Sequence, residues 1–569
     1  MKSANRWLLL VLSALAAGLI LAPSGWGDLY NETDGQYGAA AKTMARGGSW
    51  LVPENDGIPR LVKPPLLYWA MAVSMKTFGV NAFAARLPGA LATVAWVLLT
   101  FLFGTRMGGA WRGFLAGAIL LTSLGIFTLG RIVMPEPLFS ALIAGGLYCV
   151  LRAQDDAIRR QRWFVGFWIC AALASFTKGP HGLLYPLLII GGAVLLCPSA
   201  RKEFRGLLSW QGALIFLAIN LPWYVFIESK YPGWLGNLFF TEQLGHVTGS
   251  SAPATNYSIV PRWQFLFLHG AWFFPWSIVT LTVLLSSWKS LGRIVIRRPN
   301  FTTALVASWA VVILASVLLA GQRQDYYAMA MWPAAMLGIA ALIENRSLRP
   351  AAITLSVLLA MGFLAALALP LLSPTILTGD TASVAERSTA WATLTNFDRS
   401  VWQSLRVTAL WSLGGATLGA ALAAGMTGRK QIFALVAASA CLAFGAVGGM
   451  SVVSPYFSLA KIAPVLTSAA TSETRLIYDG GLDSGSSLLF YTDLPVTWLD
   501  QNPKEDFVTR RFGIGRDLFL TSPQLAKLWK SGQPILLVTE KSKLLYWQSV
   551  TNQKMTQIAE SGTQILLKN

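Results

Sequence analysis

Apolar runs of membrane-spanning length alternate with short polar segments along most of the chain. A helix needs about 20 mostly apolar residues to cross a bilayer, and about thirteen segments fit that pattern. They lie at residues 7–22, 83–104, 111–129, 136–152, 163–177, 179–197, 211–228, 263–286, 302–321, 325–344, 351–371, 406–426 and 431–451. The sequence therefore predicts an all-α polytopic membrane protein.

The polar segments between these runs differ in charge from one side of the predicted bundle to the other. If the N-terminus is cytoplasmic, the connections on that side are short and basic, as at residues 152–162 and 289–298. Cytoplasmic loops carry such an excess of Lys and Arg. Lys2 and Arg6 precede the first run, which we interpret as an uncleaved first helix rather than a secretory signal. We expect a multi-pass protein of a bacterial inner membrane with a cytoplasmic N-terminus.

The opposite, periplasmic face has the longer connections, beginning with the first loop at residues 23–82. Two segments of this loop have helical apolar spacing and carry Trp or Tyr, which predicts helices lying on the outer membrane surface. Residues 452–569 change character: short apolar strands such as "RLIYDG", "SSLLFYT", "PVTWLD", "QPILLVTE" and "TQILLKN" alternate with polar turns. One helix is predicted in "SPQLAKLWKSG", with a Ser cap. We therefore divide the chain into a membrane domain, 1–451, and a periplasmic α/β domain, 452–569.

Composition agrees with this division and limits the function. Hydrophobic residues make up 54% of the chain and charged residues only 12%, with a mean hydropathy of +0.53, whereas soluble domains carry about 25% charged residues. The net charge of +19 is explained by the basic cytoplasmic loops, so no nucleic-acid partner is expected. The four cysteines fall in or beside apolar runs without metal-ligand spacing.

Charged residues gather at the periplasmic ends of the predicted helices, where they are costly unless paired or functional. This group consists of Glu32, Asp34, Arg60, Lys63, Arg131, Glu136, Lys178, Arg262, Arg323 and Asp325. Carboxylates act as general bases or metal ligands, and Lys and Arg bind phosphate. Together they indicate group transfer from a phosphorylated lipid.

Each of these residues also has a structural alternative. Glu32 and Asp34 suit the first turn of a helix, where carboxylates are favourable. Lys63 can extend to the lipid headgroups. Arg131 and Glu136 can close a short turn as an ion pair. Their joint occurrence on one face is what favours a functional site.

The order of several motifs resembles the GT-C integral-membrane glycosyltransferases, in the branch of protein O-mannosyltransferases and aminoarabinose lipid A transferases. The matching pieces cover about residues 25–340. They are an acidic first loop leading into "YGAAAKTM", then "KPPLLYW", "ARLPGAL", "GRIVMPEP", "TKGPHGLLYP", "LPWYVF", "YPGWLGNLFF" and "QDYYAMAMWPA". The resemblance implies a GT-C fold, a sugar donor linked to polyprenyl phosphate such as undecaprenyl phosphate, and inversion at the anomeric carbon.

The resemblance also implies roles for individual residues. The catalytic carboxylate would be Asp34, with Glu32 as the second choice, and Glu136 stands at the second acidic position. The resemblance places Lys63 and Arg323 at the donor phosphate. Three more cations on the same face are further candidates to bind it: Arg131, Arg262 and Lys178. The substrate pocket would include Tyr37, Arg60, Tyr68, Tyr326 and Tyr327. The chain departs from the family at "ETDGQY", where Gln36 replaces an arginine and the acids are separated, and at Val62, which replaces a glutamate before Lys63.

We expect no certain cofactor, although Asp34 and Glu136 are candidates to share a divalent cation such as Mg²⁺, Mn²⁺ or Zn²⁺. The partners expected are membrane lipids, the polyprenyl-linked donor, and an acceptor that is lipid A, another glycan or glycolipid, or a protein. Two other classes stay open: a transporter or flippase for an anionic polyprenyl-linked lipid, and a non-catalytic scaffold. A transporter would favour charges at mid-membrane and internal repeats.

Overall fold

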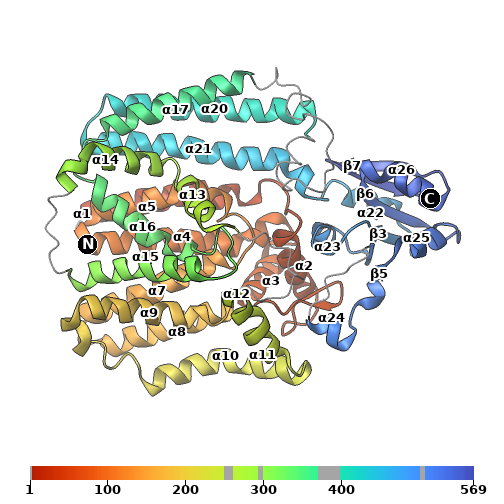
Figure 1. The fold of residues 1–569 in the computed structure, drawn as a ribbon, viewed down its shortest axis with the longest axis horizontal. Helices are drawn as coiled ribbons and strands as arrows, with labels where there is room; N and C mark the ends of the chain where they lie inside the picture. The colour runs from red at the N-terminus through yellow and green to blue at the C-terminus, as the bar shows by residue number, and fades with distance from the viewer. Residues whose placement is uncertain (1–2, 249–259, 292–298, 369–396, 500–506) are drawn as a thin grey trace.

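The chain folds into a helical bundle followed by a small α/β domain (Figure 1). The computed structural model describes residues 3–248, 260–291, 299–368, 397–499 and 507–569. Long helices run side by side through the bundle, and the α/β domain lies beyond the end at which α21 (Gly428–Phe457) finishes. This arrangement confirms the predicted fold class of a membrane-type helical bundle with a C-terminal α/β domain.

Helices occupy the segments predicted to span the membrane. They are α1 (Ser3–Ala16) with η1 (Ala17–Leu21), α4 (Ala82–Gly108), α5 (Ala110–Leu121), α7 (Glu136–Asp155), α8 (Arg160–Lys178), α9 (His181–Leu196), α10 (Trp210–Lys230), α13 (Arg262–Trp272) with α14 (Trp276–Leu291), α15 (Phe301–Leu319), α16 (Trp332–Ile343), α17 (Arg349–Ala368), α20 (Arg399–Ala424) and α21. Within the described residues, 8 helices are long and apolar enough to cross a membrane, or 9 if one bent pair counts as a single span. Because α5 and α9 are shorter, the total number of spans stays a prediction.

Two predicted spans have different boundaries in the structure. The segment 263–286 is not one straight helix, because α13 and α14 meet at 100°. Pro275 at this bend has no N–H to continue a helical hydrogen-bond ladder. The other difference is α20, which begins at Arg399 rather than at residue 406. Arg406 therefore lies within a helix that is long and apolar enough to span a membrane.

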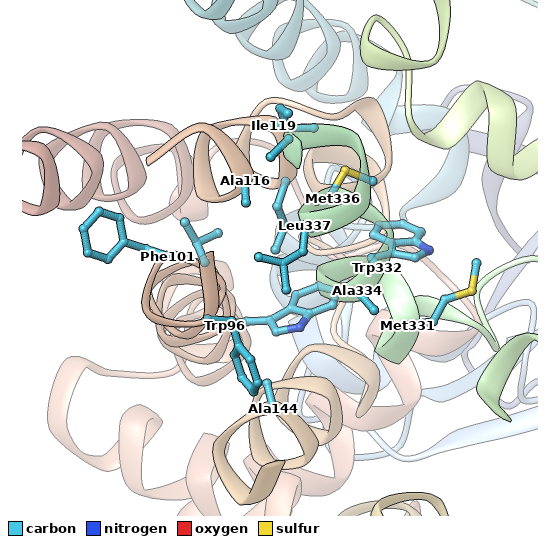
Figure 2. Packing of buried hydrophobic residues seen from close by; sticks show 14 of the residues in the cluster. Trp96, Phe101, Ala116, Ile119, Ala144, Met331, Trp332, Ala334, Met336 and Leu337 are labelled. Atoms are coloured by element: carbon cyan, nitrogen blue, oxygen red, sulfur yellow. The ribbon is translucent and has the colours of Figure 1, made fainter. Parts of the chain in front are cut away.

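The core of the bundle is formed by large side chains packed against small ones (Figure 2). Trp96 on α4 and Trp332 on α16 are fully buried and stack with their ring centroids 6.1 Å apart. Around them, Figure 2 shows Ala116 and Ile119 of α5 and Ala144 of α7. Small residues let neighbouring helices approach closely, and membrane helix packing depends on such contacts.

The C-terminal domain contains a mixed six-stranded sheet in the order β5-β4-β3-β6-β8-β7. Its strands are β3 (Arg475–Tyr478), β4 (Val496–Leu499), β5 (Phe519–Leu520), β6 (Ile535–Glu540), β7 (Thr556–Ser561) and β8 (Gln564–Lys568). The strands from β5 to β6 run parallel, and β8 pairs antiparallel with both β6 and β7. The chain therefore adds strands first on one side of β3 and then on the other.

Three predictions about this domain are corrected. The segment "SSLLFYT" is not a strand, because it forms the helix α23 (Ser486–Tyr491). The predicted helix is α25 (Ser522–Trp529), but its cap is Thr521, which forms a capping box with Gln524. The division between residues 451 and 452 falls inside α21, which ends at Phe457.

The first loop contains the two predicted helices, α2 (Thr33–Ala45) and α3 (Leu66–Phe78). α2 is not exposed on a surface, because it is buried along most of its length beneath the C-terminal domain (Figure 1). Its glycines allow this contact. A Cβ added to Gly35 would lie 2.5 Å from Ser486 Oγ, and one added to Gly38 would lie 3.0 Å from the Phe490 ring.

The first loop also completes the hydrogen bonding of α23. At the beginning of that helix, Ser487 N donates to Asn31 Oδ1 at 3.1 Å. At its end, Lys42 Nζ donates to the carbonyls of residues 489 and 490 and to Thr492 O at 2.6 Å. The same ammonium group pairs with Asp493 at 2.7 Å. The ends of a helix leave backbone groups without intrahelical partners, so the loop and the domain stabilise each other.

Replacement of Gly35 by Ala should weaken the contact between α2 and α23, because the new methyl group would overlap the backbone at residues 486 and 487. We expect a loss of about 1–3 kcal/mol of stability, the usual cost of overpacking. Thermal unfolding in detergent and the rate of proteolysis between the bundle and the C-terminal domain would measure it. Gly89→Ala is the matched control, since a Cβ added at that position would meet no atom within 4 Å. Equal behaviour of the two variants would contradict the prediction.

A second contact between loop and domain involves a buried carboxyl group. Asp56 lies in the turn between β1 (Glu54–Asn55) and β2 (Ile58–Pro59), and it accepts a hydrogen bond from Val496 N at 3.2 Å. Burial raises the pKa of Asp56 to about 6. Because a raised folded-state pKa favours the protonated acid, this group lowers stability as pH rises from about 4 to 6.

The Asp56→Asn variant should therefore gain stability over the natural protein at pH 7.5 and lose that advantage near pH 4.5. The expected advantage at pH 7.5 is about 1–3 kcal/mol, because about two pKa units separate the folded and unfolded states. Thermal unfolding of both proteins across this range measures the difference and cancels the contribution of other carboxylates. A difference that does not change with pH would show that Asp56 is not the responsible group.

Candidate active site

The candidate site is organised around the segment that joins α6 (Leu124–Thr128) to α7. This segment contains Arg131 and leads to Glu136 in the first turn of α7. Its backbone is held by the first loop, because Val133 N donates to Asp34 Oδ1 at 2.6 Å. Residues far apart in the sequence therefore meet at the end of the bundle that adjoins the C-terminal domain.

Asp34 is a buried anchor in this structure. Its Oδ2 accepts from Tyr30 N at 3.2 Å and pairs with Arg86 Nη2 at 3.4 Å, and only 2% of the residue is exposed. Arg86 also donates to backbone carbonyls of the first loop, including Asp28 O at 2.6 Å. Both carboxylate oxygens are therefore engaged, which favours a positioning role for Asp34 over proton transfer. The role of Asp34 as a base remains a prediction that this geometry does not favour.

Glu32, the second choice for the catalytic acid, is exposed at the start of α2. Its backbone has a positive φ of 64°, which is uncommon for a residue other than glycine. Its N–H donates to Asp483 O in the C-terminal domain at 2.8 Å. The contact with the domain thus helps to hold Glu32 in this conformation.

Glu136 forms a cluster with two lysines. Glu136 Oε1 pairs with Lys178 Nζ at 3.0 Å. Glu136 is 4% exposed, and its Oε2 is buried with no hydrogen-bond partner among the residues that the structure describes. The Lys178 ammonium lies 5.3 Å from the centre of the Phe139 ring and 5.2 Å from that of Tyr327. A buried carboxylate oxygen without a partner is costly, so it indicates a place for a ligand's donor group.

Lys63 completes this cluster, which we call the lysine–glutamate cluster: Lys63, Glu136 and Lys178. Burial lowers the pKa of Lys63, and the nearby positive charge of Lys178 lowers it further. Arg60 also lowers this pKa, whereas Glu136 and Glu242 raise it. Three cations therefore face two carboxylates, which leaves an excess of positive charge suited to an anion such as phosphate.

Arg60 connects the lysine–glutamate cluster to the C-terminal domain. Its Nε donates to Tyr68 Oη at 3.2 Å, and its guanidinium carbon lies 5.0 Å from the centre of the Tyr37 ring. Tyr37 and Tyr68 stack with centroids 4.9 Å apart. Arg60 Nη1 donates to Gln36 Oε1, and Gln36 Nε2 donates to Asp483 Oδ1. Gln36 therefore bridges Arg60 of the first loop and Asp483 of the C-terminal domain by hydrogen bonds.

The structure separates Arg131 from the lysine–glutamate cluster. Burial lowers the pKa of Arg131 to about 10, and the positive charge of Arg86 contributes, whereas Tyr30 and Asp34 oppose the shift. None of these residues is among the charged groups that shift the pKa of Lys63. The alternative in which Arg131 and Glu136 form an ion pair is wrong, since the carboxylate of Glu136 pairs with Lys178.

Arg323 and Arg262 lie together near the start of α13 and are bound by backbone carbonyls. Arg323 Nη1 donates to Val260 O at 3.0 Å, and Arg323 Nε donates to Val317 O at 3.4 Å. Arg262 Nε donates to Leu318 O at 2.9 Å. Burial and the charge of Arg262 lower the pKa of Arg323. These contacts give both arginines a structural role, and their binding of donor phosphate remains a prediction.

Tyr326 and Tyr327 occupy the segment that follows Arg323. Their rings lie 5.2 Å apart, edge to face. Tyr327 contacts Lys178 and so borders the lysine–glutamate cluster. Asp325 beside them has a raised pKa because it is buried.

A divalent cation shared by Asp34 and Glu136 does not fit the structure. The Asp34 carboxylate is surrounded by N–H donors, and Glu136 is paired with an ammonium group. In the part of the chain that the structure describes, no group of three or more His, Cys, Asp or Glu side chains is placed to hold a metal. The residues present therefore do not supply a cation site at this position.

Sequence reasoning missed two residues that organise the site, Arg86 and Asp483. Arg86 lies in "ARLPGAL" near the start of α4, and a single cation at the end of an apolar helix was the available signal. Asp483 offers no comparable signal, because its contact with Gln36 joins segments separated by 447 residues.

Parts of the chain resemble known proteins in sequence. The family described as dolichyl-phosphate-mannose-protein mannosyltransferase matches residues 62–226. The undecaprenyl phosphate-alpha-4-amino-4-deoxy-L-arabinose arabinosyl transferase 2 of Pseudomonas fluorescens is 26% identical over 347 residues, which are 60% of this chain and 57% of that protein. The corresponding transferase of Pseudomonas aeruginosa is 28% identical over 355 residues, 61% of each chain.

Among solved structures, ArnT from Cupriavidus metallidurans bound to undecaprenyl phosphate has the same fold. The TM-score is 0.80 at 21% identity, and the match covers 100% of this chain and 98% of that one. The sequence matches span about six-tenths of the length of the curated relatives, whereas the fold matches throughout. The chain therefore has the fold of this transferase, and about six-tenths of it resembles the aminoarabinose transferases in sequence.

Proposed function

We propose that this protein is a glycosyltransferase that moves a sugar from a polyprenyl-phosphate donor to a lipid acceptor. The observation that carries the proposal is the lysine–glutamate cluster, in which two half-buried lysines lie near the buried carboxylate of Glu136, whose Oε2 has no partner in the described part of the chain. Excess positive charge suits the phosphate of the donor, and the carboxylate suits the hydroxyl of the acceptor.

In this mechanism, Lys63 and Lys178 bind the phosphate of the donor. The acceptor oxygen forms a bond to the anomeric carbon while the bond from that carbon to the phosphate oxygen breaks. Polyprenyl phosphate leaves with the electron pair, and its growing charge is stabilised by the two ammonium groups, an electrostatic contribution that is often the largest in catalysis. Glu136 Oε2 accepts the proton of the acceptor, and attack opposite the leaving group inverts the anomeric carbon.

The remaining first-loop residues position this cluster. Asp34 holds the segment before α7 through Val133, and Arg60 contacts the stacked Tyr37 and Tyr68. Rigid placement of reacting groups lowers the barrier because little reorganisation is needed at the moment of reaction. These residues therefore act through geometry rather than through proton transfer.

For the substrates, we propose an undecaprenyl-phosphate-linked pentose of the aminoarabinose type as the donor and lipid A as the acceptor. The names of the relatives support the donor. We also propose a cytoplasmic N-terminus and a periplasmic C-terminal domain, because the basic connections lie at the end of the bundle opposite the site. A hexose donor, a protein acceptor and lipid transport without transfer are outcomes that the same assay separates.

The Glu136→Gln variant should lose transfer by about 10²–10⁴-fold, the contribution of a positioned general base. Donor binding should stay within a few fold, since the amide keeps the shape of the side chain. Lys63→Gln should instead weaken donor binding by about tenfold or more, because a hydrogen bond to a charged group contributes about 1.5–3 kcal/mol. The measurement is radiolabelled sugar moved from polyprenyl phosphate to lipid A in proteoliposomes.

The exposed residues Glu473 and Lys76 provide matched controls as Glu473→Gln and Lys76→Gln, which should both transfer at the natural rate. Full activity of Glu136→Gln would remove the base assignment. Movement of the lipid across the bilayer with no new glycosidic bond would favour a flippase.

The Asp34→Asn variant should lose stability, because it leaves Arg86 buried without its counter-charge. Removal of one partner from a buried ion pair costs about 3–5 kcal/mol, less here because backbone carbonyls also bind Arg86. Thermal unfolding measures this loss. In the control variant Asp155→Asn, the pair with Arg106 is broken where the side chains are 27% and 34% exposed, so the change should stay within about 1 kcal/mol. A stable but inactive Asp34→Asn would restore Asp34 as the base.

A further inference from the structure

A second feature of the bundle lies apart from the lysine–glutamate cluster. A cavity of about 350 Å³ is bordered by α6, the bend between α13 and α14, and the facing halves of α20 and α21. Its size falls within the range of about 300–1,000 Å³ that is usual for ligand pockets. It lies in the N-terminal half of α20 and the C-terminal half of α21, and it is therefore at the end of the bundle nearest the C-terminal domain.

The walls of this cavity suit hydrocarbon. Most of the lining residues are apolar, among them Phe127, Trp402 and Leu405. The hydroxyls of the lining are engaged within the protein: Thr122, Thr408, Ser412 and Ser439 each donate to a carbonyl of their own helix. A ligand in the cavity therefore meets few polar groups, which favours an acyl chain over a sugar or a peptide.

Two arginines lie close along the chain to residues that line the cavity. Arg406 follows Leu405 on α20, seven positions after Arg399 at the start of that helix. Its Nε is buried and has no hydrogen-bond partner within the described ranges. A cation inside a helix that can span a membrane is costly and marks a functional site unless it is paired.

The second arginine, Arg131, follows the lining residue Phe127 by four positions. It borders a small cavity that shares Phe127 with the large one, and its Nη1 is buried without a partner among the described residues. The carboxylate of Asp34 already pairs with Arg86, so Arg131 has no ion-pair partner of its own among the described residues. Apolar walls close to two arginines that each have a buried nitrogen without a described partner match the chemistry of a lipid that carries phosphate.

We propose that this cavity binds an acyl chain of a phosphorylated lipid, with Arg131 and Arg406 binding its phosphate groups. The assignment of this lipid as the acceptor rests on the proposed function, whereas the binding itself does not. Arg131 lies on the segment that leads to Glu136. A lipid held by Arg131 is therefore close along the chain to the lysine–glutamate cluster, and the donor and acceptor phosphates are kept at separate cationic sites.

The test is native mass spectrometry of the purified full chain with lipid A that carries two phosphates, and with the same lipid after dephosphorylation. The natural protein should hold one copy of the phosphorylated lipid and bind the dephosphorylated form about tenfold or more weakly. Arg131→Gln and Arg406→Gln should remove most of this preference for phosphate. Ala409→Phe should weaken both lipids, because Ala409 lines the cavity and the ring would fill it.

Two variants of α20 serve as controls. Arg399→Gln changes an exposed arginine at the start of the helix, and Ala421→Phe places the same ring at an exposed position; both should bind as the natural protein does. Excess inorganic phosphate should not displace the lipid if the acyl chain contributes to binding. If phosphate alone displaces it, or if Arg131→Gln and Arg406→Gln keep the preference, the proposal is wrong.

These measurements test the lipid site and the proposed function independently. If the natural protein transfers no sugar but all the proteins bind lipid as expected, the proposed function is wrong and this site remains. Normal transfer to lipid A by Arg406→Gln and by Ala409→Phe, with unchanged lipid binding, would overturn this site and leave the function in place. If Ala409→Phe does not fold, Arg406→Gln still decides, because its side chain is half-exposed and easily replaced.

Discussion

The contact between Asp34 and Arg86 holds together the parts of the chain on which the site depends. Arg86 near the start of α4 binds carbonyls of the first loop, and Asp34 at the start of α2 binds the segment that leads to α7. The exposed fractions of the two side chains are 4% for Arg86 and 2% for Asp34. An isolated charge at such a place would be costly, so each group depends on the other. Glu136 and the first loop keep their relative positions because this pair is formed.

Positive charge is in excess at two separate places in the structure. At the lysine–glutamate cluster, cations outnumber carboxylates, and burial has already lowered the pKa of Lys63. An arriving phosphate therefore restores charge balance at this cluster. At Arg131, a second excess of positive charge lies beside apolar walls. The same physical rule, a buried cation that lacks a full counter-charge, points to phosphate chemistry at both places.

Local pattern was enough to predict most of the fold. The long apolar runs and the basic connections predicted the helices, and the strands β3, β4, β6 and β8 followed from short apolar segments between turns. The strand predicted at "SSLLFYT" failed because α23 is stabilised from outside, by Asn31 and Lys42 of the first loop. The bend between α13 and α14, by contrast, coincides with a residue of the local sequence, Pro275.

The candidate site was only partly predictable for the same reason. Lys63, Glu136 and Lys178 were identified from their positions at helix ends, and the structure brings them together. The sequence could not show that Asp34 is enclosed by Arg86 and Val133, because these partners lie 52 and 99 residues away. Nor could it show that Arg323 binds backbone carbonyls. Residue type and position along a helix predict which charges gather at one face, whereas their pairing is decided by tertiary contacts.

The sheet of the C-terminal domain has one further consequence. In sheets where strands are added on both sides of a first strand, ligands bind beyond the carboxyl end of that strand, where the order reverses. Here the loop after β3 carries Asp483, which contacts Glu32 and Gln36. The first loop of the same chain therefore occupies this end of the sheet. Its effective concentration there is high because the two parts are covalently linked. Any molecule that binds at that strand edge must compete with the first loop, and by releasing it would disconnect the domain from Arg60.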